Sequence, residues 1–153
     1  MQIETFVLCH AATDSGRGQL NVLGTFDMLF ARQLPAVQAQ CAIALRMRFE
    51  RSERREHQLA ISIVDADGTK LGPAPDIKVP VNFPDQLTSH AFNFIFNLQQ
   101  LRFEHFGEYA IGVALNGDHQ MSLPFSVREM PQQQQQQGGP PQDWPKIDPS
   151  QRG

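Results

Sequence analysis

The chain has 153 residues, a formal net charge of −3 at pH 7 and a sequence pI of about 5.9. This length fits one domain with a single core, because domains usually run to about 100–200 residues. A mildly acidic chain is a poor candidate for binding nucleic acid, which depends on neutralising phosphates with lysine and arginine.

The first residues carry an acid at Glu4, no basic stretch and no apolar run long enough for export or for a bilayer. These features predict a cytoplasmic chain without a transmembrane segment. Cys9 and Cys41 are the only cysteines. In a reducing compartment they are expected to be small core residues, and a disulfide or a metal site is the alternative.

Two strands are predicted in the N-terminal part of the chain. Residues 3–11 form the first, and its apolar side chains occur at both parities, so both faces are expected to be partly covered. Residues 14–19 contain two glycines and predict a loop, and residues 20–30 predict the second strand. Residues 33–40, which include Pro35, are expected to form a connection.

The third predicted strand has the clearest alternation in the chain. Its inward side chains are Cys41, Ile43, Leu45, Met47 and Phe49, and its outward ones are Ala42, Ala44, Arg46, Arg48 and Glu50. Residues 51–56 predict a charged hairpin tip, and residues 59–63 predict the returning strand. Ile77, Val79 and Val81 then alternate among several prolines, which predicts an edge strand, where missing amide donors cost least.

The C-terminal half supplies the predicted centre of the core. Phe92, Phe94 and Phe96 share one face and are expected to form the main wedge between two sheets. Residues 109–115 and 121–127 alternate on either side of Asn116-Gly117-Asp118 and predict a tight antiparallel hairpin. The predicted fold class is therefore all-β: over residues 1–129, a two-sheet antiparallel β-sandwich of about seven or eight strands, immunoglobulin-like or C2-like.

A tyrosine that enters the penultimate strand just after a glycine, Gly107-Glu108-Tyr109, is similar to the tyrosine corner of immunoglobulin-like sandwiches. Two residues on, where the immunoglobulin pattern has its second disulfide cysteine, this chain has Ile111. The resemblance to the corner therefore implies the architecture of that fold rather than its disulfide.

Three longer stretches carry a resemblance to a known family: MQIETFVLCHAATDSGRGQLNVLGTFD, LPAVQAQCAIALRMRF and GEYAIGVALNGDHQMSLPFSVRE. Together they resemble a family of small, uncharacterised bacterial proteins that is described as a domain of unknown function. The resemblance covers residues 1–129 and implies a bacterial, cytosolic origin and a β-sandwich. It implies no activity, substrate or site.

Side chains that carry common chemistry are present but scattered. The five histidines form no pair at helix or strand spacing, and no acidic residues accompany them in a metal-ligand pattern. Cys9 and His10 are neighbours on a strand, so they point to opposite faces and do not form a nucleophile and its base. Without a recognisable catalytic motif, the sequence predicts no enzyme, no catalytic residue and no cofactor.

Two loop regions carry weaker candidate sites. Asp65 and Asp67, in Asp-Ala-Asp-Gly, are candidate calcium ligands, and a plain turn is the alternative. Counting strands as alternately up and down places this loop at the same end as Glu104 and His105. The candidate contacts for a phosphate or an acidic ligand are Arg46, Arg48, Arg51, Arg54 and Arg55. The alternative is a solvated surface, because Glu50, Glu53 and Glu56 intervene.

The composition changes abruptly after residue 129, with a run of six glutamines followed by glycines and prolines. Such a tail, residues 130–153, is predicted to be disordered because it has little apolar surface to bury. Trp144, Pro145 and Ile147 within it are a candidate motif for docking to a partner. The alternative is a tail without a selected role.

The sequence as a whole favours a non-enzymatic protein-interaction or assembly module. Its partner is expected to be an unknown protein or a second copy of the chain, and no nucleic acid. The alternative is a module that uses one loop end to bind a ligand or a lipid surface, with the arginines or the Asp65 turn as contacts.

Overall fold

The structure is a computed structural model, and it describes residues 1–72 and 74–132. Nine strands occur in this part of the chain. They are β1 (Gln2–Asp14), β2 (Leu20–Thr25), β3 (Met28–Ala31), β4 (Ala36–Glu50), β5 (Glu56–Asp65), β6 (Asp76–Pro80), β7 (Ser89–Phe103), β8 (Gly107–Leu115) and β9 (Asp118–Glu129). One 3-10 turn, Arg51–Glu53, joins β4 to β5. No helix among the described residues is long and apolar enough to cross a membrane.

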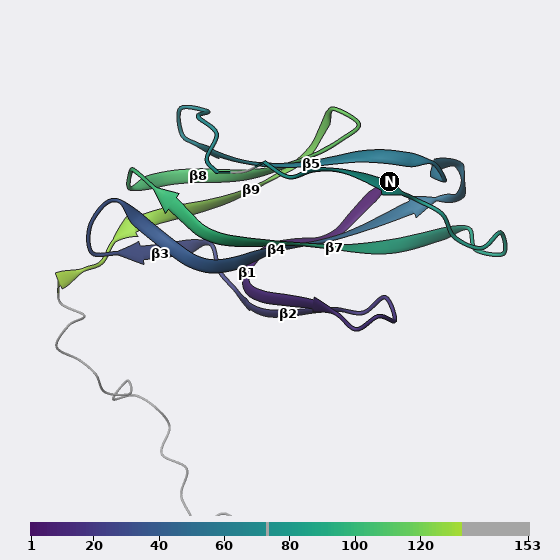
Figure 1. Cartoon of the computed structure of the whole chain (residues 1–153), viewed down its shortest axis with the longest axis horizontal. Coiled ribbons are helices and arrows are strands. Elements are labelled where there is room, and N and C mark those ends of the chain that lie inside the picture. Colours follow the sequence, from purple (N-terminus) through teal and green to yellow (C-terminus); the bar gives the residue numbers. More distant parts are fainter. Residues whose placement is uncertain (73, 133–153) are drawn as a thin grey trace, which may run out of the picture.

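The strands form two packed sheets, as Figure 1 shows. The four-stranded sheet has the order β2-β1-β4-β7, and the five-stranded sheet has the order β3-β9-β8-β5-β6. The predicted all-β sandwich is therefore confirmed. Strand β6, which carries the alternating Ile77 and Val79, lies at an edge as the prolines around it indicated.

The prediction of one strand over residues 20–30 is wrong, because the chain crosses from one sheet to the other inside it. β2 pairs with β1, whereas β3 pairs with β9, and this second pairing is parallel. Backbone hydrogen bonds divide the segment, since the Phe26 amide donates to Leu8 and the Asp27 carbonyl accepts from Ser126. Gly24 just before the crossing has a φ of +65°, and a Cβ there would lie 2.6 Å from the His10 ring. Only glycine fits this position without strain.

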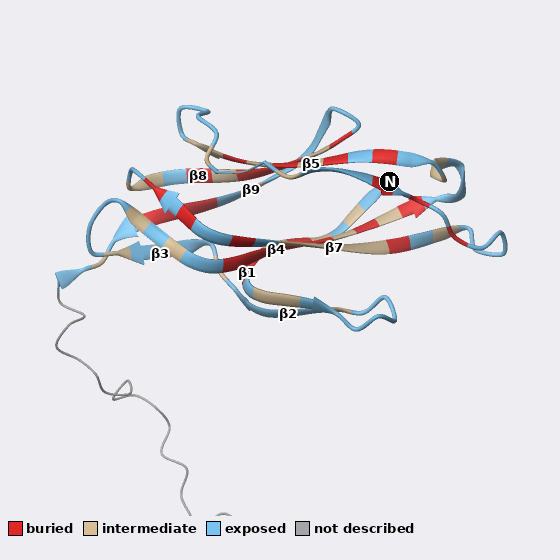
Figure 2. Ribbon diagram, in the orientation of Figure 1, coloured by how far each residue is buried: buried red, intermediate tan, exposed pale blue. Residues whose placement is uncertain are grey.

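The central strand of the core is β4 rather than β7. The alternating side chains of β4 from Cys41 to Phe49 are at most 1% exposed, which confirms the predicted inward face. The expectation that Phe92, Phe94 and Phe96 form the main wedge is wrong, because all three are only half-buried. The reason is that β7 lies at the edge of its sheet, where a side chain has a neighbouring strand on one side only. Figure 2 shows much of this strand in the colour of intermediate burial.

A third layer covers part of the outer face of the four-stranded sheet. β1 pairs with β4 as far as Cys9 and then leaves it to pair with β2, so the hairpin of β1 and β2 folds beneath β4 and β7 (Figure 1). Ala42 and Ala44, which were predicted to face outward, are buried under Ala12 and Leu20 of this hairpin. Small side chains on β4 allow the two layers to approach closely.

The two cysteines are buried free thiols on opposite faces of the four-stranded sheet. Cys9 belongs to the small cluster under the hairpin, whereas Cys41 belongs to the main core. Burial raises the pKa of the Cys9 thiol, and it raises that of Cys41 to about 11. Both are therefore protonated at neutral pH and inert, as expected for core cysteines.

The tyrosine corner is formed. Tyr109 is buried at the start of β8, and its hydroxyl donates a hydrogen bond of 2.7 Å to the backbone carbonyl of His105. This bond ties β8 to the turn that precedes it, four residues upstream, which is the arrangement found in immunoglobulin-like sandwiches.

Candidate functional site

The predicted arginine contacts fall into two groups, and the first group stabilises the hairpin. Arg46 donates hydrogen bonds to Glu4, to the side chain of Asn93 and to the carbonyl of Gly18 in the hairpin turn. Arg48 donates to the same Glu4 carboxylate and lowers its pKa. The guanidinium groups of Arg46 and Arg48 are thus engaged by the protein itself on the outer face of β4.

The second group of arginines holds the loop that follows β6. Arg51 donates to the carbonyl of Leu87, and Arg54 donates to the carbonyl of Phe83 and pairs with Asp85. The Arg54 guanidinium also lies 5.8 Å from the centre of the Phe83 ring, within cation–π range. Arg55 is exposed. The five arginines therefore do not converge on one anion site.

The Asp65 turn is closed by its own backbone. The Asp65 carboxylate accepts hydrogen bonds of 2.9 Å from the amides of Asp67 and Thr69. His105 and Glu108 line the same small hollow of about 140 Å³, so the loop lies at the end of the sandwich at which strand counting placed it. No group of three or more potential metal ligands occurs among the described residues.

Calcium or phosphate is expected to leave the melting temperature of the full chain unchanged, because the Asp65 carboxylate and four of the five candidate arginines already have internal partners. A ligand at 100 times its Kd would add about 2.7 kcal/mol of stability, or roughly 5–10 °C for a domain of this size. Thermal unfolding with and without each ion measures this. A rise of several degrees with calcium that Asp67→Asn abolishes would contradict the expectation.

The third predicted site, Trp144, Pro145 and Ile147, lies outside the described residues. A different surface emerges from the part of the chain that the structure describes, at the free edge of β2. β2 pairs with β1 on one side only, and its sequence Leu-Asn-Val-Leu-Gly-Thr contains no charged residue and no proline. Natural edge strands are usually protected by such residues.

Apolar side chains are unusually exposed along this edge. Leu23 is 70% exposed, the largest value for a large apolar side chain in residues 1–72 and 74–132, and Val22 is 36% exposed. A shallow groove of about 350 Å³ runs along the hairpin and is lined by Ala11, Ala12, Thr13, Asn21, Val22 and Leu23. The lining contains no ionisable group, so it suits an uncharged, extended segment.

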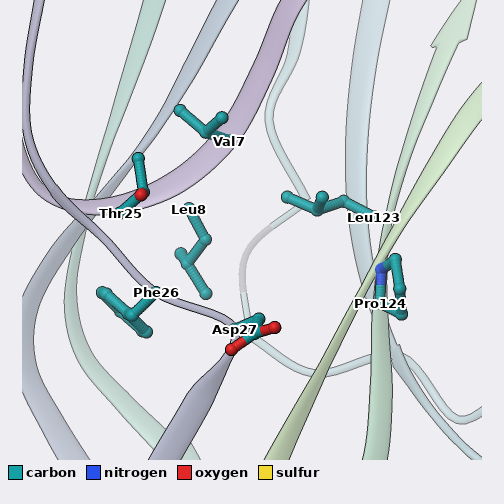
Figure 3. A pocket seen from close by; sticks show the side chains of 7 residues that line it. All are labelled: Val7, Leu8, Thr25, Phe26, Asp27, Leu123 and Pro124. Carbon is teal, nitrogen blue, oxygen red and sulfur yellow. The ribbon is translucent and has the colours of Figure 1, made fainter.

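A second groove, of about 320 Å³, lies where the chain crosses between the sheets. Figure 3 shows its lining, which comprises Val7 and Leu8 of β1, Thr25, Phe26 and Asp27 of the crossing, and Leu123 and Pro124 of β9. β3 covers only the last part of β9, from Ser126, so the edge of β9 is free beside this groove. Pro124 removes an amide donor there, which protects that edge better than β2 is protected.

The sequence profile of a Family of unknown function (DUF6941) matches residues 4–128. The chain belongs to this family. The resemblance to a domain of unknown function is thereby confirmed over residues 4–128. No curated protein matches the DUF6941 chain.

Among solved structures, the chain is similar to the Pseudomonas fluorescens alkylpurine DNA glycosylase AlkC bound to DNA containing an abasic site analog. The identity is 12% and the TM-score is 0.38, over 67% of this chain and 28% of the glycosylase. The DUF6941 chain thus spans less than a third of the length of that protein, and a likeness at this TM-score carries no argument about function.

The free β2 edge of the DUF6941 chain was missed by sequence reasoning. Residues 20–25 do form a strand, as predicted, but apolar character alone does not distinguish a buried strand from an exposed one. The sequence did hold one indication of an unprotected edge, which is the lack of charged residues and prolines in residues 20–25. The edge strand β6, by contrast, contains Lys78 and Pro80.

Proposed function

We propose that this protein is a non-enzymatic protein-interaction module of the cytoplasm that takes an extended segment of a partner protein onto the free edge of β2. Such strand addition uses backbone hydrogen bonds for affinity and alternate side chains for specificity. The observation that carries the proposal is the uncharged, unprotected β2 edge with Leu23 70% exposed.

The surroundings of the edge support a rigid site rather than a loose one. The hairpin that carries β2 is anchored at its turn, because Arg46 donates to Gly18 and Asn93 donates to Asp14. The bond from Asn93 holds the pKa of Asp14 below its usual value, because it stabilises the ionised carboxylate. A partner segment would therefore meet an edge that is already ordered, which reduces the entropy lost on binding.

The chemistry of the groove defines the partner segment. Alanine, valine, leucine, threonine and asparagine line it, so a partner strand with uncharged side chains at alternate positions fits, and a charged one would lose solvation without compensation. The ligand-binding alternative has less support, because four of the five candidate arginines and the Asp65 carboxylate have internal partners.

The experiment is a selection of short random peptides displayed on phage against the full chain. Peptides with alternating uncharged side chains are expected to bind, and hydrogen exchange with a synthetic copy should show new protection over residues 20–25. Leu23→Lys places a charge on the edge and should weaken binding at least tenfold, about 1.4 kcal/mol.

Ile77→Lys is the matched control, because Ile77 is also an exposed apolar residue, 39% exposed, on an edge strand of the other sheet. It should leave peptide binding unchanged. The proposal fails if no peptide is selected, if protection appears on another strand, or if the Leu23→Lys chain binds as well as the parent. Light scattering on both chains shows whether a second copy takes the partner's place.

A further inference from the structure

A second exposed apolar surface lies where β3 meets the start of β4. β3 is the edge strand opposite β6 in the five-stranded sheet. Phe30 and Val37 are each 52% exposed and line one small hollow of about 50 Å³ between these strands. Met28 and Leu34, 44% and 38% exposed, belong to the same stretch of chain. These four residues are called the Phe30 patch below.

The last described residues of the chain lie directly beside the Phe30 patch. β3 pairs with the end of β9, with Phe30 opposite Arg128. The Met130 amide then donates a hydrogen bond of 2.9 Å to the carbonyl of Ala31, the neighbour of Phe30. Residues 131–153 therefore begin directly after a residue that is bonded beside the Phe30 patch.

We propose that the segment around Trp144-Pro145-Lys146-Ile147 of the same chain docks on the Phe30 patch. This segment holds the chain's only tryptophan and the only isoleucine after Ile111. A large aromatic side chain beside a proline is a common anchor on an exposed apolar patch, because it buries much area and loses little conformational entropy. The inference is independent of the β2 surface.

The spacer between Met130 and the docking segment is long enough for this contact. Thirteen residues lie between Met130 and Trp144, and the fourteen chain steps from one to the other reach at most roughly 46–50 Å. Because it starts beside the patch, it has to turn back over a short span only. A short tether holds its end at an effective concentration of about 1 mM, so a segment with a Kd of about 0.1 mM would be docked about nine-tenths of the time.

Charges near the patch favour this occupant. Arg32 is exposed in the connection that follows β3, and Arg102, which pairs with Glu104, lies opposite Val37 in the ladder of β4 and β7. Asp143 and Asp148 flank the docking segment. Opposite charges at the rim of an apolar contact set its orientation more than its strength.

The test uses the fluorescence of the full chain, in which Trp144 is the only tryptophan. Docking predicts an emission maximum at shorter wavelength and acrylamide quenching severalfold weaker than in a synthetic peptide of residues 140–153. Phe30→Ser and Val37→Ser, each made in the full chain, should return both values to those of the peptide. Two variants are used so that a folding defect in one does not decide the result.

Ile77→Ser is the control, since it removes an exposed apolar side chain at the opposite edge of the same sheet, and it should change nothing. Leu23→Lys should also leave the emission unchanged, which separates this inference from the β2 proposal. Emission equal to that of the free peptide, or unaltered in folded Phe30→Ser and Val37→Ser chains, overturns the proposal. A shift to longer wavelength on dilution would mean docking on a second copy and would also overturn it.

Discussion

Replacing Phe103 by alanine should lower the free energy of unfolding by about 3–5 kcal/mol, the largest loss expected for a single substitution in this protein. Phe103 is fully buried at the end of β7. Its ring lies edge-on to Tyr109, at 5.1 Å between centroids, and to Phe125, at 5.9 Å. Truncation would therefore remove two aromatic contacts and leave a cavity between the sheets.

The measurement is equilibrium unfolding in urea of the parent and of two variants, Phe103→Ala and Phe94→Ala. Phe94 lies on the same strand but is only half-buried, so its loss should be clearly smaller. The dependence on urea should keep the same slope in all three, since the midpoint alone changes when stability changes. An equal or larger loss for Phe94→Ala would mean that the row predicted from the sequence is the wedge after all.

The contrast between β4 and β7 shows which features of a strand its periodicity predicts. Alternation along the chain identified the inward face of β4 and the hairpin of β8 and β9, because a half-buried strand leaves that pattern wherever it lies. It did not identify the position of a strand within its sheet. Phe92, Phe94 and Phe96 alternate as clearly as the residues of β4 do, yet β7 is an edge strand and they remain partly exposed.

The candidate sites depended on long-range contacts that the sequence does not display. Arg46 and Arg48 are close in sequence to Arg51 and Arg54, which suggested a shared anion site. Their partners, however, lie more than 25 residues away in sequence, at Gly18, Asn93, Leu87 and Phe83. Several arginines close in sequence therefore predict a basic surface. Whether their side chains are available to a ligand depends on the pairing of distant strands.

Replacing Ala44 by leucine should destabilise the fold by about 1–3 kcal/mol and displace the hairpin of β1 and β2. Ala44 was expected to face solvent, but it is fully buried on the outer face of β4, between Val7 and Ile95 in the neighbouring strands. Leucine adds three carbon atoms where Ala12 and Leu20 of the hairpin already pack. Since close-packed layers do not absorb that volume, the hairpin has to move outward.

Hydrogen exchange over residues 9–25, together with urea unfolding, separates displacement of the hairpin from general loss of stability. Exchange in this segment should rise more than exchange in β8, which belongs to the other sheet. Ala60→Leu is the matched control, because Ala60 is a half-buried alanine of β5 in the five-stranded sheet and should tolerate the larger side chain with little loss. Equal losses in the two variants, with exchange unchanged in the hairpin, would mean that the third layer does not depend on the small side chains of β4. If displacement is observed, the Leu23 edge moves with the hairpin, so Ala44→Leu should also weaken any peptide held on β2.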